Sequence, residues 1–276
     1  GWKQGFYMRE PDKHLLLRSD YLRKEAELYL KFLTEGGDIY ENEFLKKTLV
    51  DVSNGTKAMN EWVYNQTKSL LEKGKLVGLV GGDHSTPLGF FKAIGEHKGE
   101  FGILQVDAHA DPRDAYEGFQ YSHASIMYYA LAEVPQLSRL VQVGVRDYCE
   151  EEMDYINNSE GRVVTFFDKQ IKERQYEGES WKAICDSIIA TLPQQVYISF
   201  DIDGLDPKLC PHTGTPVAGG FEAEQVYYLF RRVLDSGRQL IGFDLNEVST
   251  SHDEWDANVG ARVLFKLCNL LIRSNS

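Results

Sequence analysis

The sequence contains few cysteines and no paired cysteine motif. Its 276 residues include four cysteines, at Cys149, Cys185, Cys210 and Cys268, and none of them forms a C-x-x-C pair. Zinc sites built from thiolates commonly contain such pairs, so the sequence argues against this class of metal site. Widely scattered cysteines are typical of reduced thiols, and we therefore expect a cytoplasmic location.

Long apolar runs and an excess of positive charge are also missing. No segment approaches the roughly 20 apolar residues of a membrane helix, and no signal-peptide pattern is visible. The 30 Lys and Arg residues are outnumbered by 42 Asp and Glu residues, which gives a net charge of −12. This balance argues against nucleic acid and anionic membranes as partners and favours a cationic substrate.

Apolar runs alternate with helical patterns along the chain. Runs such as LVGLV, VYISF and LIGFD are continuously apolar, as are parallel strands covered on both faces. Strands are predicted at Thr48–Val52, Leu76–Gly81, Phe101–Asp107, Leu140–Val145, Val163–Phe167, Val196–Asp201 and Leu240–Leu245. Helices are predicted at Ser19–Thr34, Thr56–Lys73, Pro87–Glu96, Ala124–Ala132, Ser180–Thr191, Ala223–Ser236 and Asp256–Leu271. This order predicts an α/β fold, a three-layer doubly wound parallel sheet, in a single domain over residues 1–276.

Acidic and imidazole side chains follow four of these predicted strands. The motifs are GGDHS after the second strand, DAHAD after the third, SFDIDGLDP at the sixth and DLNEV at the seventh. Ligands of doubly wound sheets gather at the carboxyl ends of the strands, so these side chains are expected to meet. A lone Asp at a strand end is usually a cap or a turn residue, as Asp206 before Pro207 is expected to be. GGDHS, DAHAD and SFDIDGLDP together are far more specific than any one of them.

The spacing within DAHAD indicates a metal site. Residues i, i+2 and i+4 of an extended chain point to one face, so Asp107, His109 and Asp111 converge if the strand conformation continues past its end. Asp201 and Asp203 do the same from another strand. Carboxylates at such close range repel one another and take up protons unless cations neutralise them. Two divalent cations would do so, and oxygen-rich ligation with a minority of histidine suits Mn²⁺ better than Zn²⁺, with other divalent metals left open.

At these motifs the sequence resembles the ureohydrolases, the superfamily of arginases, agmatinases and formiminoglutamases. The resemblance runs from about Leu76 to Leu271 and implies an arginase-like fold with a binuclear manganese centre. The implied metal ligands are His84, Asp107, His109, Asp111, Asp201 and Asp203. Among them, Asp107 and Asp201 are the implied bridging carboxylates. The resemblance also implies a homo-oligomer, either a trimer or a hexamer.

The resemblance implies catalytic roles for two further residues. His123, in YSHAS, matches the histidine that serves as proton shuttle or general acid. Glu247, in DLNEV, matches the glutamate that holds the substrate's guanidinium group. Asp111 could also receive the proton of the attacking hydroxide. The alternatives are a helix-start histidine with a local backbone bond for His123, and a salt bridge with Arg262 for Glu247.

Departures from the family pattern bear on the substrate. Arginases follow their D-A-H-x-D motif with an Asn- and Thr-rich loop, whereas PRDAYEGFQYSHAS in this sequence is closer to agmatinases. The segment HTGTPVAGG resembles the GTGTP segment and favours a guanidino over a formimino substrate. We expect metal-activated hydroxide to hydrolyse an agmatine-like compound to urea and an amine, with Glu117 or Asp147 near the distal ammonium. Carboxylate-bearing substrates would need an arginine, for which Arg113 and Arg146 are candidates.

Alternatives to this function stay open. They are arginase or formiminoglutamase activity and, in a different class, a non-catalytic relative stabilised by metal. Family members also begin with a strand and a Gly-rich stretch, and ahead of Leu76 only TLVDVSNGT resembles one of their strands. Either an N-terminal strand region is missing from this chain, which starts at Gly1, or this member is built differently.

Overall fold

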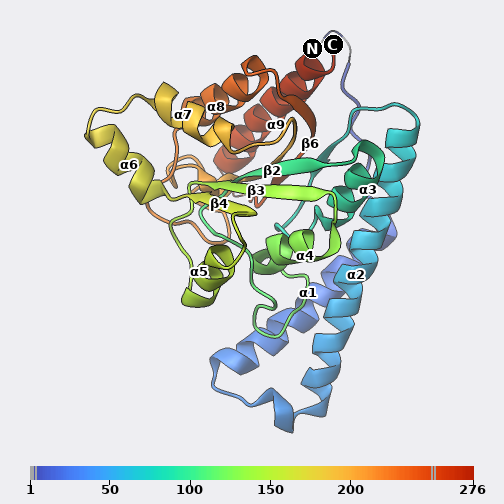
Figure 1. Ribbon diagram of the computed structural model, residues 1–276. Coiled ribbons are helices and arrows are strands. Elements are labelled where there is room, and N and C mark those ends of the chain that lie inside the picture. Colours follow the sequence, from blue (N-terminus) through green and yellow to red (C-terminus); the bar gives the residue numbers. More distant parts are fainter. Residues whose placement is uncertain (1–2, 4, 250, 252) are drawn as a thin grey trace.

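A parallel sheet forms the centre of the molecule. The computed structural model describes residues 3, 5–249, 251 and 253–276. Within them, the strands run in the order β1-β6-β5-β2-β3-β4, and every neighbouring pair is parallel (Figure 1). The strands are β1 (Gly78–Val80), β2 (Phe101–Val106), β3 (Leu137–Val143), β4 (Val163–Phe166), β5 (Gln195–Asp201) and β6 (Gln239–Asn246).

Helices cover both faces of this sheet. The α-helices of the described residues are α1 (Lys13–Thr34), α2 (Glu43–Glu72), α3 (Leu88–Lys98), α4 (Ile126–Glu133), α5 (Glu150–Asn157), α6 (Asp168–Tyr176), α7 (Trp181–Ala190), α8 (Ala223–Asp235) and α9 (Trp255–Ser274). Figure 1 shows α7, α8 and α9 on one face and α3 and α4 on the other. The predicted three-layer doubly wound α/β fold is therefore confirmed.

Each face of the sheet has its own apolar core. On the α8 side, Phe200 of β5 packs against Phe230 with ring centroids 6.0 Å apart. On the α3 side, Phe90 and Phe91 both meet the ring of Tyr197 edge-on, at 5.1 and 5.0 Å. Burial on both faces explains why β2 and β5 read as continuous apolar runs rather than as alternating patterns.

The order of the strands places a switch point between β2 and β5. From β2 the chain adds β3 and β4 outward on one side, and it then returns to place β5 on the other side of β2. The crevice at such a reversal, beyond the carboxyl ends of the strands, is where ligands bind in doubly wound sheets.

The strand predicted at Thr48–Val52 is wrong, because this segment lies inside the helix α2. The Asn42 side chain caps that helix by accepting hydrogen bonds from the backbone N–H groups of Phe44 and Leu45. Leu45 and Thr48 are buried one helical turn apart whereas Val50 is exposed, which is the pattern of a helix with one buried face. The described residues therefore contain six strands in place of the predicted seven, and TLVDVSNGT is not one of them.

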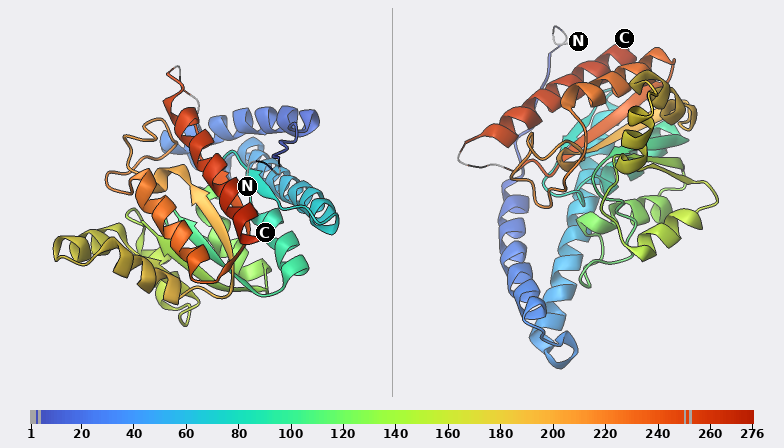
Figure 2. Two further views of the ribbon diagram at one scale, coloured as in Figure 1. Left: turned by 90° about the horizontal axis from the view of Figure 1, so that it is seen from above. Right: turned by 90° about the vertical axis from the view of Figure 1, so that its left-hand side faces the viewer.

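Two further helices, α5 and α6, were not predicted. Both are short and rich in charged residues, so they lack the apolar spacing that marks a helix in the sequence. At the other end of the chain, α1 and α2 form a hairpin that extends beyond the sheet layers (Figure 2). In the part of the chain that the structure describes, no helix combines the length and the apolar character needed to cross a membrane.

Candidate metal centre

Polar side chains from four strands meet at the carboxyl edge of the sheet. His84 follows β1, Asp107 follows β2, Asp201 ends β5 and Glu247 follows β6. Because parallel strands all end at the same edge, segments that are far apart in sequence come together here. The site lies at the switch point between β2 and β5.

His84 faces three carboxylates. Its Nδ1 atom lies 2.9 Å from Oδ2 of Asp107, 3.2 Å from Oδ2 of Asp111 and 3.4 Å from Oδ2 of Asp201. All four side chains are buried, and Nδ1 of His84 has no hydrogen-bond partner among the described residues. A buried nitrogen without a partner, surrounded by carboxylate oxygens, is a donor set that a divalent cation would complete.

A second group of ligand atoms shares Asp107 with the first. Nδ1 of His109 lies 3.5 Å from Oδ1 of Asp107 and 3.0 Å from Oδ2 of Asp203. Asp107 thus presents one oxygen to each group, which is the arrangement expected of a bridging carboxylate. Asp201 lies beside the first group and accepts a hydrogen bond from the backbone N–H of Asp203, and its own bridging role stays a prediction.

A turn, rather than a continued strand, brings DAHAD together. The strand β2 ends at Val106, and Asp111 adopts a left-handed backbone with φ of 61°. The Asp107 carboxylate accepts a hydrogen bond from the His109 N–H at 2.6 Å, and this bond tightens the turn. The expectation that the strand conformation would persist to Asp111 is therefore wrong, although the three side chains do converge.

Glycine allows the two metal-binding motifs to approach each other. A Cβ atom on Gly204 would lie 2.8 Å from the backbone nitrogen of Asp107 and 2.8 Å from a methyl carbon of Val106. Beside it, the Asp203 carboxylate accepts a hydrogen bond from the N–H of Ala108 at 3.0 Å. A side chain at position 204 would separate the segments that carry the ligands.

The electrostatics of the cluster show an excess of negative charge. Burial, together with the charge of Asp107, raises the pKa of Asp111 to about 7. Burial and the charges of Asp203 and Asp107 raise the pKa of Asp201 well above its usual value. Burial by itself lowers the pKa of His109, but its contacts with Asp107 and Asp203 outweigh burial and raise the pKa of His109 to about 11. Acids and imidazoles that hold protons so firmly would release them to divalent cations, so the residues present fit a metal pair.

Two buried polar residues that sequence reasoning missed orient His84. Its Nε2 atom lies 2.8 Å from Oγ of Ser199, which in turn donates a hydrogen bond to Oδ1 of Asp244 at 3.0 Å. Ser199 and Asp244 are fully buried inside the strands β5 and β6. This contact leaves Nδ1 of His84 facing the carboxylates, a supporting arrangement common around metal-binding histidines.

A second pair of buried, hydrogen-bonded side chains supports Asp107. Gln105 donates from its amide to Oδ2 of Asp107 at 2.9 Å, and Gln142 of β3 donates to Oε1 of Gln105 at 2.8 Å. Both glutamines are fully buried. The sequence did carry a signal for both supporting pairs, because Gln105 and Ser199 are polar residues inside otherwise apolar strands.

Glu247 reaches the site from the end of β6. Its Oε1 atom accepts a hydrogen bond from the backbone N–H of His84 at 2.9 Å, and Thr213 donates to its carbonyl oxygen at 2.9 Å. Burial and the charge of Asp83 raise the pKa of Glu247 to about 7. Arg262, the alternative salt-bridge partner considered above, instead donates to the side chain of Asn258.

His123 lies beside the centre at the start of a 3₁₀ turn, His123–Ser125. Its ring meets the ring of Tyr116 at a centroid distance of 5.4 Å and an angle of 71°. Burial lowers the pKa of His123, and the positive charges of His109 and His84 add to this effect. The charge of Asp83 opposes this shift, and an imidazole beside the ligand cluster can take up a proton and release it again.

The two arginines considered as carboxylate partners are engaged elsewhere. Arg146 donates hydrogen bonds to backbone carbonyl oxygens, among them those of Asp203 at 2.7 Å and Val217 at 3.0 Å. Arg113 pairs with Glu152 at 3.4 Å and lies over the ring of Tyr116. Both side chains therefore stabilise loops around the site.

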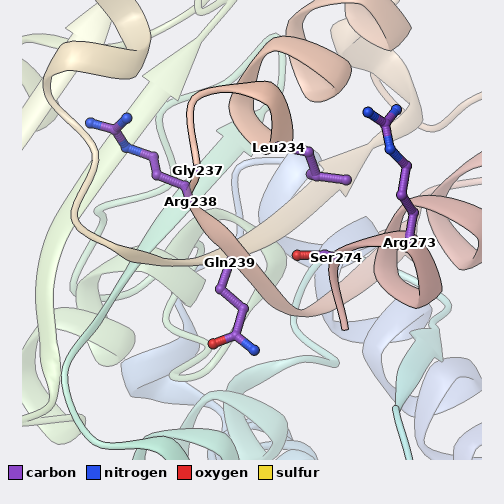
Figure 3. A pocket seen from close by; sticks show the side chains of 6 residues that line it. All are labelled: Leu234, Gly237, Arg238, Gln239, Arg273 and Ser274. Atoms are coloured by element: carbon purple, nitrogen blue, oxygen red, sulfur yellow. The ribbon is translucent and has the colours of Figure 1, made fainter. Parts of the chain in front are cut away.

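A separate pocket lies at the opposite end of the sheet (Figure 3). Its lining residues are Leu234, Gly237, Arg238, Gln239, Arg273 and Ser274. Gln239 begins β6, whereas Glu247 follows the other end of that strand, so this pocket is distinct from the candidate metal centre.

Comparison with known proteins decides the family. The model of the Arginase family matches residues 19–269. The chain belongs to the arginase family. An N(1)-aminopropylagmatine ureohydrolase of Thermus thermophilus is 39% identical to this arginase-family chain over 180 residues, 65% of the chain and 57% of the relative. A guanidinobutyrase of Pseudomonas aeruginosa is 34% identical over 212 residues, 73% of the chain and 62% of the relative.

Solved structures show the same fold. An arginase from Bacillus subtilis superimposes with a TM-score of 0.67 at 23% identity, covering 78% of this chain and 79% of the other. A proclavaminate amidino hydrolase from Streptomyces clavuligerus superimposes with a TM-score of 0.65 at 25% identity, covering 78% and 70%. The arginase-like architecture predicted from the motifs is confirmed.

Proposed function

We propose that this arginase-family chain is a binuclear manganese hydrolase that cleaves an agmatine-like guanidino compound to urea and an amine. The observation that carries the proposal is a pair of ligand groups sharing Asp107, with Glu247 beside them. In this proposal residues 1–276 act as one catalytic domain. A cytoplasmic location and assembly into a trimer or hexamer belong to the same proposal.

Six side chains would hold the two cations. One cation would be bound by the group around His84 and the other by the group around His109, with Asp107 shared and Asp201 as a second bridge. Their oxygen-rich composition favours Mn²⁺. Bound divalent cations supply hydroxide near neutral pH, because they lower the pKa of water to about 7.

The chain's own residues then orient the reaction. Glu247 accepts charge-assisted hydrogen bonds from the guanidinium N–H groups and so fixes the guanidinium carbon over the ligand cluster. Asp111 accepts the proton of the hydroxide that attacks the guanidinium carbon. As the carbon–oxygen bond forms and the carbon–nitrogen bond breaks, the protonated form of His123 donates a proton to the leaving amine and returns to the neutral imidazole.

Three observations favour a substrate with an amine tail. Arg113 and Arg146 are engaged with Glu152 and with backbone carbonyls, so neither is free to hold a substrate carboxylate. Asp147, largely exposed and 3.8 Å from the ring of His109, offers a carboxylate to a distal ammonium at the rim. The similar relatives also include proteins named N(1)-aminopropylagmatine ureohydrolase and agmatinase.

A substrate panel tests the proposal. The protein is loaded with Mn²⁺, its metal content is measured, and products are identified after incubation with agmatine, N(1)-aminopropylagmatine, arginine, guanidinobutyrate and formiminoglutamate. We expect urea, with the highest kcat/KM for the two amine-tailed compounds, and no turnover after chelation of the metal. Turnover of a carboxylate-bearing compound alone would overturn the substrate assignment. No turnover at two metal ions per chain would support the non-catalytic alternative.

A further inference from the structure

We propose that Tyr29 of α1 is a positioning residue for the candidate site. Its hydroxyl group holds the turn at residues 116–119, which presents the ring of Tyr116 to His123. The inference rests on the proposed function for its effect on turnover. It gives the hairpin of α1 and α2 a part in the active site, although neither helix carries a ligand.

The turn has an unusual backbone that needs support. Tyr116 and Phe119 exchange two backbone hydrogen bonds, of 3.1 and 2.8 Å, and close a two-residue hairpin. Both residues at its tip are left-handed, with φ of 50° at Glu117 and 84° at Gly118. Hairpin turns of this type suit glycine, whereas a glutamate in the left-handed region is strained and persists when neighbouring structure holds it.

Helix α1 supplies that support. Tyr29 is fully buried, and its hydroxyl group donates a hydrogen bond of 2.9 Å to the backbone carbonyl of Glu117. The ring of Tyr29 also packs on Phe119, with centroids 4.9 Å apart. A Cβ atom on Gly118 would lie 3.0 Å from the Tyr29 hydroxyl oxygen and 3.3 Å from Leu49 of α2. Both helices therefore close over the turn, and Figure 1 shows the loop ahead of α4 extending toward α1.

The same turn places the ring of Tyr116 against the ring of His123. The two rings meet edge to face at 5.4 Å, and Arg113 lies over the Tyr116 ring at 5.3 Å. Tyr116 is the residue directly before Glu117, so a shift of the Glu117 carbonyl moves the Tyr116 backbone as well. Release of the Tyr29 hydroxyl bond would loosen the contact that fixes the His123 imidazole.

The substitution Tyr29→Phe tests this chain of contacts, because it keeps the ring that packs on Phe119 and removes only the hydroxyl group. Tyr21→Phe is the matched control, since Tyr21 lies on the same helix and is 60% exposed. We expect Tyr29→Phe to lower kcat/KM by about three- to tenfold, the effect of losing one hydrogen bond. We also expect faster amide exchange at Tyr116 and Phe119 and a changed pH profile of kcat, with Tyr21→Phe like the wild type.

The outcomes separate positioning from stability. Unchanged kcat/KM with a lowered melting temperature would overturn the inference, because the hydroxyl would then support only the fold. If the wild type hydrolyses none of the panel, the proposed function fails on its own. The proposed positioning role of Tyr29 is then tested by amide exchange at the turn and by the NMR resonances of the His123 imidazole. A change in both for Tyr29→Phe alone supports the inference, and spectra and exchange like those of the wild type overturn it.

Discussion

The acidic residues of this site have different partners. Asp203 and Asp201 face imidazole nitrogens of the ligand cluster, at 3.0 Å from His109 and 3.4 Å from His84. Glu247 instead accepts from the backbone N–H of His84, so its carboxylate lies at the rim of the cluster. Substitutions should therefore separate metal binding from substrate binding.

Glu247→Gln and Asp201→Ala test that separation. Glu247→Gln should keep both metal ions and lower kcat/KM by about 10- to 100-fold, mostly through KM, because charge-assisted bonds to the guanidinium are lost. Asp201→Ala should lower the number of bound metal ions as well as turnover. Metal analysis and steady-state kinetics on the same preparations provide the measurement. Loss of metal from Glu247→Gln would show that this glutamate serves the cations rather than the substrate.

The residues of the site differ in how far the sequence could predict them. The six expected ligands follow buried apolar runs in short motifs, and parallel strands bring such motifs to one edge. Ser199 and Gln105 lie within the strands themselves, and their partners depend on which strands are neighbours. That order is set by tertiary packing, so the sequence marks these residues as unusual polar positions without naming their partners.

At the scale of elements, the start of α9 anchors the loop that carries His212. Both the backbone N–H and the Nδ1 atom of His212 lie 2.9 Å from the carboxylate oxygens of Asp256, which is fully buried in the first turn of α9. The next residue, Thr213, donates to the carbonyl oxygen of Glu247. The pair of His212 and Asp256 thus links α9 to the residue proposed to hold the guanidinium.

This pair predicts a pH dependence of stability. The hydrogen bond to Asp256 raises the pKa of His212 above its ordinary value of 6.5, and the charge of Asp253 adds to the effect. A histidine with a raised folded-state pKa stabilises fully below the unfolded value and loses this contribution as pH rises through the folded value. The melting temperature of the wild type should therefore fall, relative to His212→Gln, as pH rises from about 6 to about 9.

The control for this measurement is His97→Gln, since His97 is an exposed histidine of α3 away from the loop. Its melting temperature should follow that of the wild type across the same range. A difference between wild type and His212→Gln that stays constant with pH would contradict the charged pair.

Elements with a clear apolar period were predictable, and those without one were not. The run at Thr48–Val52 has the β-branched and aliphatic residues of a strand, but short apolar runs do not distinguish strands from helix faces. The Asn42 cap and the packing of α2 against α1 and α3 stabilise the helical conformation of this run. In α5 and α6 the charged surface positions outnumber the buried ones, so their helical period is not visible in the sequence.

At the scale of the molecule, much of the buried negative charge gathers at one edge of the sheet. Asp107, Asp111, Asp201 and Asp203 are all buried there, in a chain whose net charge is −12. The alternation of strands and helices was sufficient to predict the layers and the edge where ligands gather. Strand order, and with it the place of β1 beside β6, required the three-dimensional structure.

This concentration of charge predicts that divalent cations stabilise the whole fold. Without cations, burial and the charge of Asp107 raise the pKa of Asp111 from 3.8 to about 7, so the folded state loses stability as pH rises from about 4 to about 7 and does not regain it at higher pH. At a free concentration of 100 times Kd, one bound cation adds about 2.7 kcal/mol to the free energy of unfolding. For a chain of this size we expect Mn²⁺ to raise the melting temperature by about 5–10 °C.

The effect of Mn²⁺ on the melting temperature should be larger at about pH 8 than at about pH 6, because protons compete with the cations for Asp111 and His109. Burial lowers the pKa of His109, but Asp107 and Asp203 outweigh burial and raise this pKa to about 11. Calorimetric scans of metal-free protein with and without Mn²⁺, at matched ionic strength, provide the measurement. Asp201→Ala is the control and should show a smaller shift. Equal melting temperatures with and without Mn²⁺ at the higher pH would mean that these buried acids are balanced by something other than cations.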